Sequence, residues 1–200
     1  DLVYPILKSS DLKGEEVTSF RKYVIVTQKS TSDDTSRIKI KQPQTYSYLV
    51  NHSAWFDKRG SVIYRKRPKF CIFGIGSYSF QQYKIAIAGL YKSTRFSLVK
   101  PMDNKCVMLD DTCYLLGFDD EDTANCVLKI LNSEIVQRFM KSLVFYDAKR
   151  SINKDLLMRI DLEKAAKKLY TADMLSETEY DIVMSCFERK TELQSLPLFA

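Results

Sequence analysis

The sequence lacks most of the side chains that structural metal sites and hydrolytic active sites require. Its one histidine is His52, and its five cysteines stand apart from one another without a CxxC pair. A structural zinc needs four Cys or His ligands, usually in close pairs, so this spacing argues against a zinc site. A Ser-His-Asp triad would have to use His52, which sits in an apolar helical pattern typical of a packed residue. An odd number of unpaired cysteines is typical of a reduced, cytoplasmic protein.

Long apolar runs are also missing. The sequence contains no stretch of about eighteen apolar residues, which argues against a membrane-spanning helix. Its first residues, DLVYPILKSSDLKG, show no charged start followed by an apolar core and a cleavage site, so we expect neither export nor a membrane partner. The chain begins with Asp1 rather than Met, which predicts that it was cut from a longer polypeptide or follows a tag. With 45% hydrophobic residues over 200 positions, it can bury one substantial core.

Positive charge, by contrast, is concentrated in residues 58–100. This stretch contains ten Lys and Arg, no Asp or Glu, and eight aromatic residues, whereas the parts before and after it have net charges of +1 and −5. A short basic run such as RKRPK is usually a solvated loop. Here the cations continue through later segments with tyrosines between them, and cationic plus aromatic side chains suit contacts to phosphates and bases. The pattern indicates a surface that faces a polyanion, with nucleic acid as the first candidate.

The hydrophobic patterns predict an α+β (mixed α/β) fold, with a small twisted mixed β-sheet, flanking helices and a C-terminal helical appendage. Residues 21–29 are rich in β-branched and aromatic residues, which favours a strand buried on both faces. Further strands are expected at 69–76, 83–90 and 95–99 and within 105–118, where Asp110 and Asp111 interrupt the pattern. We expect a domain over residues 1–150 and the appendage over residues 151–200.

Helices are predicted where apolar residues recur at helical spacing. Pro43 suits a first helical position ahead of about three turns that run to Phe56. Carboxylates at 119–122 precede one helix that ends near residue 131, and a second follows after a short break. Later helices are expected at 163–170 and from Ser176, whose capping box with Glu179 marks a helix start. Their apolar faces indicate ordinary packing, and the alternative is a homodimer through these C-terminal helices.

Two motifs could carry chemistry, and each has a simpler explanation. Gly74 and Gly76 form a GxG, but a dinucleotide fingerprint needs a third glycine that opens a helix, so a tight turn is favoured. Asp110 and Asp111 could bind a metal in a nuclease or hydrolase, although such a site would usually add a third acid and a lysine nearby. A structural hydrogen-bonding role is favoured for this pair. The enzyme stays open as an alternative, as does an assembly module whose helices bind a protein.

Three segments together resemble a known family. IYRKRPKFCIFGIGSYSFQQYKIAIAGLYK, then VMLDDTCYLLGF, then a helix with LNSEIVQRFMKSL are similar to the target recognition domain of TaqI-like adenine-N6 DNA methyltransferases and of fused type II restriction and modification enzymes. The chain is similar, more loosely, to type I specificity subunits. The resemblance runs from about YPILKSSDLKG to MRIDL and rests on fold patterns rather than catalytic motifs.

The resemblance implies DNA reading without chemistry. In that family a separate domain, expected here on the N-terminal side of the same polypeptide, binds S-adenosylmethionine and grips a flipped adenine with an Asn-Pro-Pro-aromatic or Asp-Pro-Pro-aromatic motif. This sequence has no two adjacent prolines and no glycine-rich cofactor turn. We therefore expect no cofactor and no catalytic residue in this chain, a double-stranded DNA partner, and a cytoplasmic bacterial parent whose own DNA cleavage stays open.

The candidate site residues follow from the basic stretch. Six cations are expected to bind phosphates: Lys58, Arg59, Arg65, Lys66, Arg67 and Lys69. A second set is expected to line the surface from which base contacts come: Tyr78, Ser79, Gln81, Gln82, Lys84, Lys92 and Arg95. Arginines suit guanine and the two amides suit adenine in direct readout.

Overall fold

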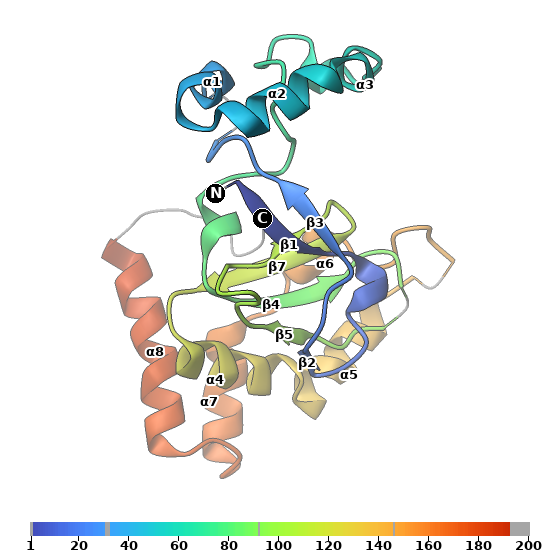
Figure 1. Cartoon of the computed structure of the whole chain (residues 1–200). Coiled ribbons are helices and arrows are strands. Elements are labelled where there is room, and N and C mark those ends of the chain that lie inside the picture. The colour runs from blue at the N-terminus through green and yellow to red at the C-terminus, as the bar shows by residue number, and fades with distance from the viewer. Residues whose placement is uncertain (1, 31–32, 92, 146, 193–200) are drawn as a thin grey trace.

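The computed structural model of the chain describes residues 2–30, 33–91, 93–145 and 147–192, with side chains to residue 188. A body of two β-sheets and packed helices makes up most of it, and a small helical subdomain projects from one end of this body (Figure 1). The combination of strands and helices confirms the predicted α+β class. Among the described residues, no helix combines the length and apolar character that crossing a bilayer requires.

The larger sheet has the strand order β2-β5-β4-β7. Its strands are β2 (Glu16–Val17), β4 (Tyr83–Ala88), β5 (Ser97–Val99) and β7 (Cys113–Phe118). β4 pairs antiparallel with both β5 and β7, whereas β2 runs parallel to β5. Ile85 and Ile87 of β4 join the main core beneath the helices, and Ala86 between them faces a second cluster with Leu7 and Val99. The sheet is therefore covered on both faces, as alternation along a strand requires.

The smaller sheet has the order β3-β1-β6, with β1 (Val3–Leu7), β3 (Lys22–Ile25) and β6 (Met108–Leu109). β1 pairs antiparallel with β3 and parallel with β6. The prediction that residues 21–29 form a strand buried on both faces is wrong. β3 is shorter and lies at an edge, and Tyr23 is 57% exposed. The ring of Tyr23 packs edge-on against Phe20, which is how an aromatic residue on a solvated edge finds a partner.

The helices that cover the larger sheet begin where their capping residues predict. α4 (Glu121–Leu131) starts after Asp120, whose carboxylate accepts the backbone N–H of Thr123 at 2.7 Å. α5 (Glu134–Leu143) follows the break at Asn132 and Ser133. The remaining helices of the body are α6 (Lys154–Leu157), α7 (Leu162–Thr171) and α8 (Glu177–Glu192). α4, α5, α7 and α8 confirm the predicted helices, because capping and periodicity are local signals, whereas α6 was not predicted.

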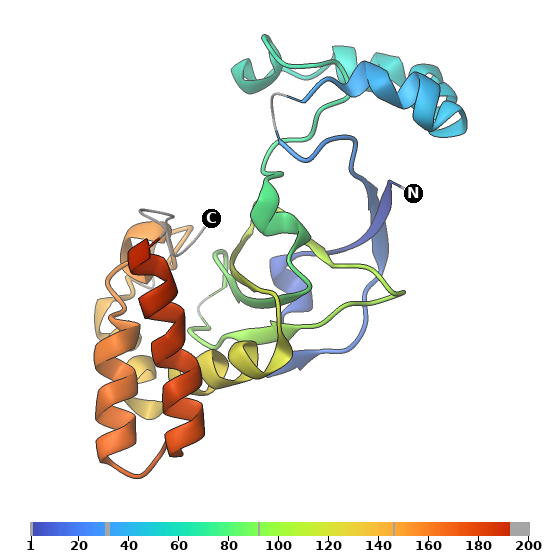
Figure 2. The same ribbon diagram turned by 90° about the vertical axis from the view of Figure 1, so that its left-hand side faces the viewer.

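α7 and α8 form an antiparallel pair that packs against the body through α4 (Figure 2). The capping box of α8 is present, with Ser176 and Glu179 exchanging side chain to backbone hydrogen bonds of 2.8 and 3.2 Å. Glu179 also accepts from Lys129 Nζ of α4 at 2.7 Å. The main core cluster runs from Ile85 of β4 to Val183 of α8, so the C-terminal helices share one core with the sheet.

The segment that lies between β3 and β4 in the sequence departs most from the predicted secondary structure. Residues 69–76, predicted to be a strand, are irregular, and short 3-10 turns stand on either side at Val62–Tyr64 and Ser77–Phe80. The carbonyls of Phe70 and Ile72 accept hydrogen bonds from the side chains of Thr27 and Gln28 instead of a neighbouring strand. The apolar content of this segment thus serves packing between subdomain and body rather than a β-ladder.

Candidate nucleic-acid interface

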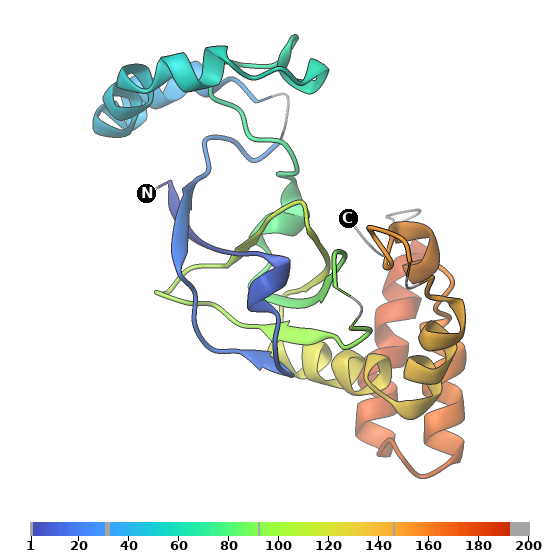
Figure 3. The same cartoon turned by 90° about the vertical axis from the view of Figure 1, so that its right-hand side faces the viewer.

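Residues 33–72 form the projecting subdomain, which stands clear of the body in Figure 1 and again in the view of Figure 3. It contains α1 (Ile38–Lys41), α2 (Pro43–Asn51), α3 (Ser53–Asp57) and the turn at Val62–Tyr64. Nine Lys and Arg and three Asp fall within it. The rest of the chain has equal numbers of basic and acidic residues, so this subdomain accounts for the whole net charge of +6.

A small aromatic core holds the subdomain together. Tyr46, Leu49 and Phe56 lie on the inner side of α2 and α3, as the apolar spacing predicted. Val50 and Trp55 of the same pattern are exposed, and the expectation that His52 is packed is wrong, because it is exposed too. The ring of Phe70, which is buried, meets Tyr46 and Phe56 edge-on at centroid distances of 5.9 and 5.1 Å. Edge-to-face pairs at these distances are favourable. The helical run is split at His52, so the predicted three turns occur as two consecutive helices.

The subdomain joins the body where residues 27–28 lie beside residues 70–72. The hydroxyl of Thr27 donates to the carbonyl of Phe70 at 2.7 Å, and Gln28 Nε2 donates to the carbonyl of Ile72 at 2.5 Å. Thr27 and Gln28 are both buried. Buried polar side chains that are fully paired fix the geometry of a connection, because leaving them unpaired would be costly.

Arg59 does not lie where the sequence predicted a phosphate contact. Its guanidinium carbon is 4.3 Å from the ring centroid of Phe56 and 4.4 Å from that of Tyr64. One of its nitrogens donates to the carbonyl of Cys71 at 2.6 Å. The half-buried guanidinium is thus used inside the subdomain, and the expectation that Arg59 presents its charge to DNA is corrected.

The other predicted phosphate ligands of the subdomain are exposed. Arg65, Lys66 and Arg67 follow one another after the turn at Val62–Tyr64, and within the described part of the chain none of them forms an ion pair. Lys58 lies over the ring of Trp55 at 5.6 Å. Lys69 is also exposed, although its Nζ is 3.2 Å from a carboxylate oxygen of Asp57. Five of the six predicted cations therefore reach the surface of one small unit.

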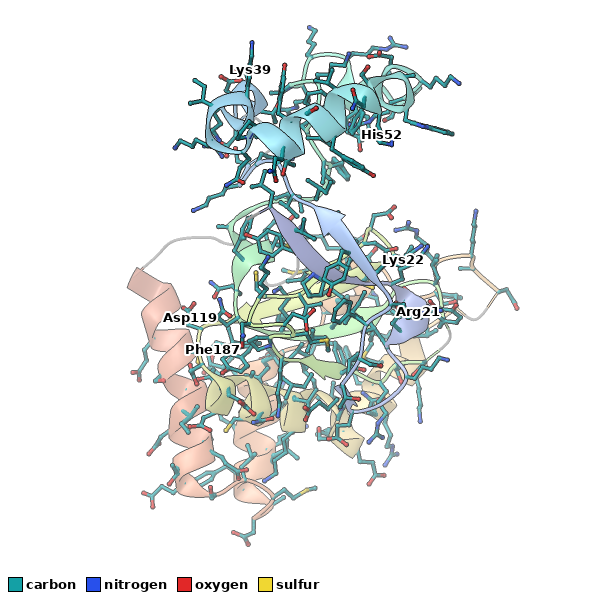
Figure 4. All side chains as sticks on the ribbon, in the orientation of Figure 1. Arg21, Lys22, Lys39, His52, Asp119 and Phe187 are labelled. Atoms are coloured by element: carbon teal, nitrogen blue, oxygen red, sulfur yellow. The ribbon has the colours of Figure 1, made fainter. Side chains whose placement is uncertain are left out.

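Lys39 and Lys41 add to this surface and were missed by the sequence reasoning. Both are exposed on α1, and Figure 4 shows Lys39 on the projecting subdomain together with His52. Their signal was weak because they precede the long basic stretch and are separated from it by α2. Counting charge over residues 33–72 as one unit would have included them.

The second predicted set does not form one surface. Tyr78 is half-buried, with its hydroxyl donating to the carbonyl of Gly74 at 2.9 Å. Ser79 is buried, and its Oγ accepts the backbone N–H of Gly76 at 3.3 Å, so its predicted surface position is wrong. Gln81 is half-buried and Gln82 is exposed. Lys92 lies outside the described residues.

Lys84 is the clearest correction within that set. It is fully buried in β4, and its Nζ donates to the carbonyl of Gln81. Burial disfavours the charged ammonium and lowers the pKa of Lys84 to about 8, despite a small opposing effect of the nearby Cys106. A side chain enclosed in this way cannot line a DNA-binding surface.

The last cations of the basic stretch lie at the end of the body away from the subdomain, next to β2 (Figure 1). Arg95 is 3.3 Å from Glu15, and Lys100 is 3.1 Å from Glu16 and 2.8 Å from Glu121. These pairs neutralise the charge locally. The single basic surface expected over residues 58–100 is therefore divided, and among its described cations the exposed ones without an acidic partner lie in the subdomain.

The Asp110 and Asp111 pair has the geometry of a turn. Asp110 Oδ1 accepts the backbone N–H of Thr112 at 3.0 Å as well as the hydroxyl of that residue. Asp111 points to Arg150, whose guanidinium lies 3.6 Å from it. Among the described residues, no group of three or more His, Cys, Asp or Glu is placed to hold a metal ion. This arrangement supports a structural role for Asp110.

The sequence of the chain is similar to that of a known type II methyltransferase. No family model matches the chain. Over 165 residues, 82% of its length, the chain is 41% identical to the type II methyltransferase M.NspV of Nostoc sp. (strain ATCC 29411 / PCC 7524). The match covers 34% of that protein, so the chain spans about a third of the length of the relative that it matches. Over most of its residues, the chain is thus related to one part of a type II methyltransferase.

Proposed function

We propose that this chain is the DNA-recognition part of a type II DNA methyltransferase from a bacterial restriction-modification system. It binds double-stranded DNA at a particular sequence in the cytoplasm and positions a methyltransferase domain that precedes it in the same polypeptide. The modified base in this proposal is adenine, at N6, as the resemblance to TaqI-like enzymes implies. The chain itself contributes binding, and the other domain contributes the chemistry.

The observation that carries the proposal is the projecting subdomain with its unbalanced charge. Exposed cations that neutralise phosphates release counterions from DNA, and Arg65, Lys66 and Arg67 are exposed and form no ion pair with any described residue. Exposed aromatic rings stand on the same unit. The similarity to part of M.NspV supports the same conclusion, since it covers most of this chain and only a third of that protein. This coverage is consistent with a protein in which one part binds DNA and another part catalyses methyl transfer.

S-adenosylmethionine is assigned to the preceding domain in this proposal. The GxG of this chain, Gly74 and Gly76, does not offer a cradle for it. A Cβ placed on Gly76 would lie 2.6 Å from the ring of Tyr78, so that ring fills the space beside the glycine. The residues present do not fit the cofactor, and no step of a methyl transfer is assigned to them.

Selection from a pool of randomised DNA duplexes tests the proposal. The 200-residue chain, immobilised and washed at low salt, should enrich duplexes that share one short motif over successive rounds. A parallel selection with a variant in which Arg65, Lys66 and Arg67 are alanine should retain far less DNA. Retention of no duplex, or retention without any shared motif, would contradict the proposal. Size-exclusion chromatography of the free chain tests the separate prediction of a homodimer through the C-terminal helices.

A further inference from the structure

The outer face of α2 and α3 carries a row of exposed side chains that stay outside the core and, in the part of the chain that the structure describes, outside the ion pairs. Tyr48, His52 and Trp55 follow at i, i+4 and i+7, and Tyr48 and Trp55 are 53% and 73% exposed. The rings of Tyr48 and His52 lie against each other with centroids 4.2 Å apart. Lys58 continues the row, 5.6 Å above the ring of Trp55. We name Gln44, Tyr48, Asn51, His52 and Trp55 the outer stripe.

The stripe is continuous despite the break between the two helices. The backbone N–H of His52 bonds to the carbonyl of Tyr48 at 3.2 Å, and that of Trp55 bonds to the carbonyl of His52 at 3.1 Å. The turn at His52 therefore keeps the chain winding in one direction. Leu49 and Phe56 stay on the inner side, and the stripe stays on the outer side.

The chemistry of the stripe and its surroundings favours duplex DNA as its occupant. Gln44 and Asn51 are exposed amides, which pair with the edge of adenine in the major groove. The rings of Tyr48 and Trp55 offer apolar faces for thymine methyl groups and bases. Lys39, Lys41 and Lys58 lie on the same small unit, and its net positive charge complements a polyanion. The stripe spans two consecutive helices, and the major groove, which is about 12 Å wide, admits an α-helix.

We propose that the outer stripe of α2 and α3 reads base edges in the major groove of duplex DNA, with Trp55 in direct contact with bases and the neighbouring lysines on the flanking phosphates. This inference rests on the proposed function and names the element that performs it. It differs from the sequence-based expectation, which placed base contacts on a set of residues between Tyr78 and Arg95, Gln81 and Gln82 among them.

Trp55 is the only tryptophan of the chain, so its fluorescence, excited at the red edge where the tyrosines do not absorb, reports the stripe. The experiment titrates a duplex enriched in the selection into the 200-residue chain at low salt. It follows Trp55 emission and acrylamide quenching, and it follows binding separately by anisotropy of a labelled duplex. The expected result is quenched emission and several-fold lower access of acrylamide, with the same midpoint as the anisotropy.

Variants separate the stripe from general surface effects. Trp55→Ala should weaken binding about tenfold, as expected for loss of one base-aromatic contact, and Trp55→Phe should restore part of it. Phe145→Ala removes an aromatic residue of the body that is 81% exposed and should change neither affinity nor the Trp55 signal. Gln44→Ala with Asn51→Ala should relax sequence preference more than Gln81→Ala with Gln82→Ala.

Three results would overturn the inference. If the duplex binds while Trp55 emission and quenching stay unchanged, the stripe does not face DNA and the proposed function still stands. If Trp55 becomes protected at high protein concentration without DNA, the stripe is an interface between copies of the chain. If no duplex binds at all, both the stripe and the proposed function are wrong.

Discussion

Arg59 donates a hydrogen bond of 2.6 Å to the backbone carbonyl of Cys71, twelve residues further along the chain. The bond closes the loop that carries Arg65, Lys66 and Arg67, with the guanidinium held between the rings of Phe56 and Tyr64. One cation of the basic stretch thus fixes the loop that presents its neighbours. Under the proposed function, a structural role and a DNA-binding role fall to residues that look alike in the sequence.

Arg59→Ala should destabilise the subdomain by about 2 kcal/mol, because it removes a charge-assisted hydrogen bond and two cation-π contacts. Arg59→Lys should recover little, since an ammonium lacks the planar fork and the stacking surface. Hydrogen exchange of amides in residues 33–72 measures the effect locally. Arg65→Ala is the matched control and should leave exchange unchanged while weakening DNA binding. Equal exchange in wild type and Arg59→Ala would show that Arg59 is not structural.

Lys84 should make stability depend on pH in a defined window. The pKa of its ammonium falls from 10.5 in the unfolded chain to about 8 in the fold, so above pH 8 the unfolded chain binds protons that the folded chain has lost. Stability therefore rises with pH in that range, and the charge is most unfavourable at lower pH. Relative to Lys84→Met, the wild-type free energy of unfolding should increase by about 1 kcal/mol between pH 8 and 9.

Urea unfolding of both proteins at several pH values checks this difference. Staying below pH 9 limits the contribution of the buried Cys113 and Cys126, whose pKa values are raised above 9.0 by desolvation. Lys84→Met fills the same space without the charge and should be the more stable protein at pH 7. A difference between the two that is independent of pH would contradict the lowered pKa of Lys84.

Asp110→Asn should lower stability by about 1 kcal/mol, because the carboxylate organises the turn through the N–H and hydroxyl of Thr112. Asp111→Asn is the matched control and should be nearly neutral, since Asp111 is exposed and its pairing with Arg150 is long. Thermal unfolding measures both. A stable Asp110→Asn protein that has lost a magnesium-dependent cleavage of DNA would favour the metal-dependent nuclease instead.

Local signals in the sequence predicted much of the body. The acidic cap within residues 119–122, the capping box at Ser176 and the strand within residues 83–90 depend on residues within a few positions. The structure confirms each of them, with Asp120 as the capping residue. The segment 69–76 has a strand-like composition, but its backbone carbonyls accept hydrogen bonds from the side chains of Thr27 and Gln28. No local sequence pattern predicts these long-range contacts. Whether a strand such as β3 lies at the edge or in the centre likewise depends on how the whole sheet is paired.

The number of cations in the candidate site could be predicted from the sequence, but their positions in the fold could not. The count of cations over residues 58–100 was correct, yet Lys84 is enclosed by the sheet and Arg95 meets Glu15, eighty positions away in sequence. Such contacts follow from long-range pairing of β2 with β5. The outer stripe was hidden for a related reason: helical spacing alone does not say which side of α2 faces the core.

Salt dependence of DNA binding tests the central claim most directly. Each cation that neutralises a phosphate releases counterions, so log affinity should fall linearly with log salt at about −0.9 per contact. Alanine at Arg65, Lys66 and Arg67 should make the slope shallower by about two to three units and weaken all sequences alike. Alanine at Lys164, Lys167 and Lys168 of α7 removes the same charge from the body and should leave the slope unchanged. If the subdomain variant keeps the slope and affinity of wild type, or if the α7 variant loses as much, the projecting subdomain is not the DNA interface.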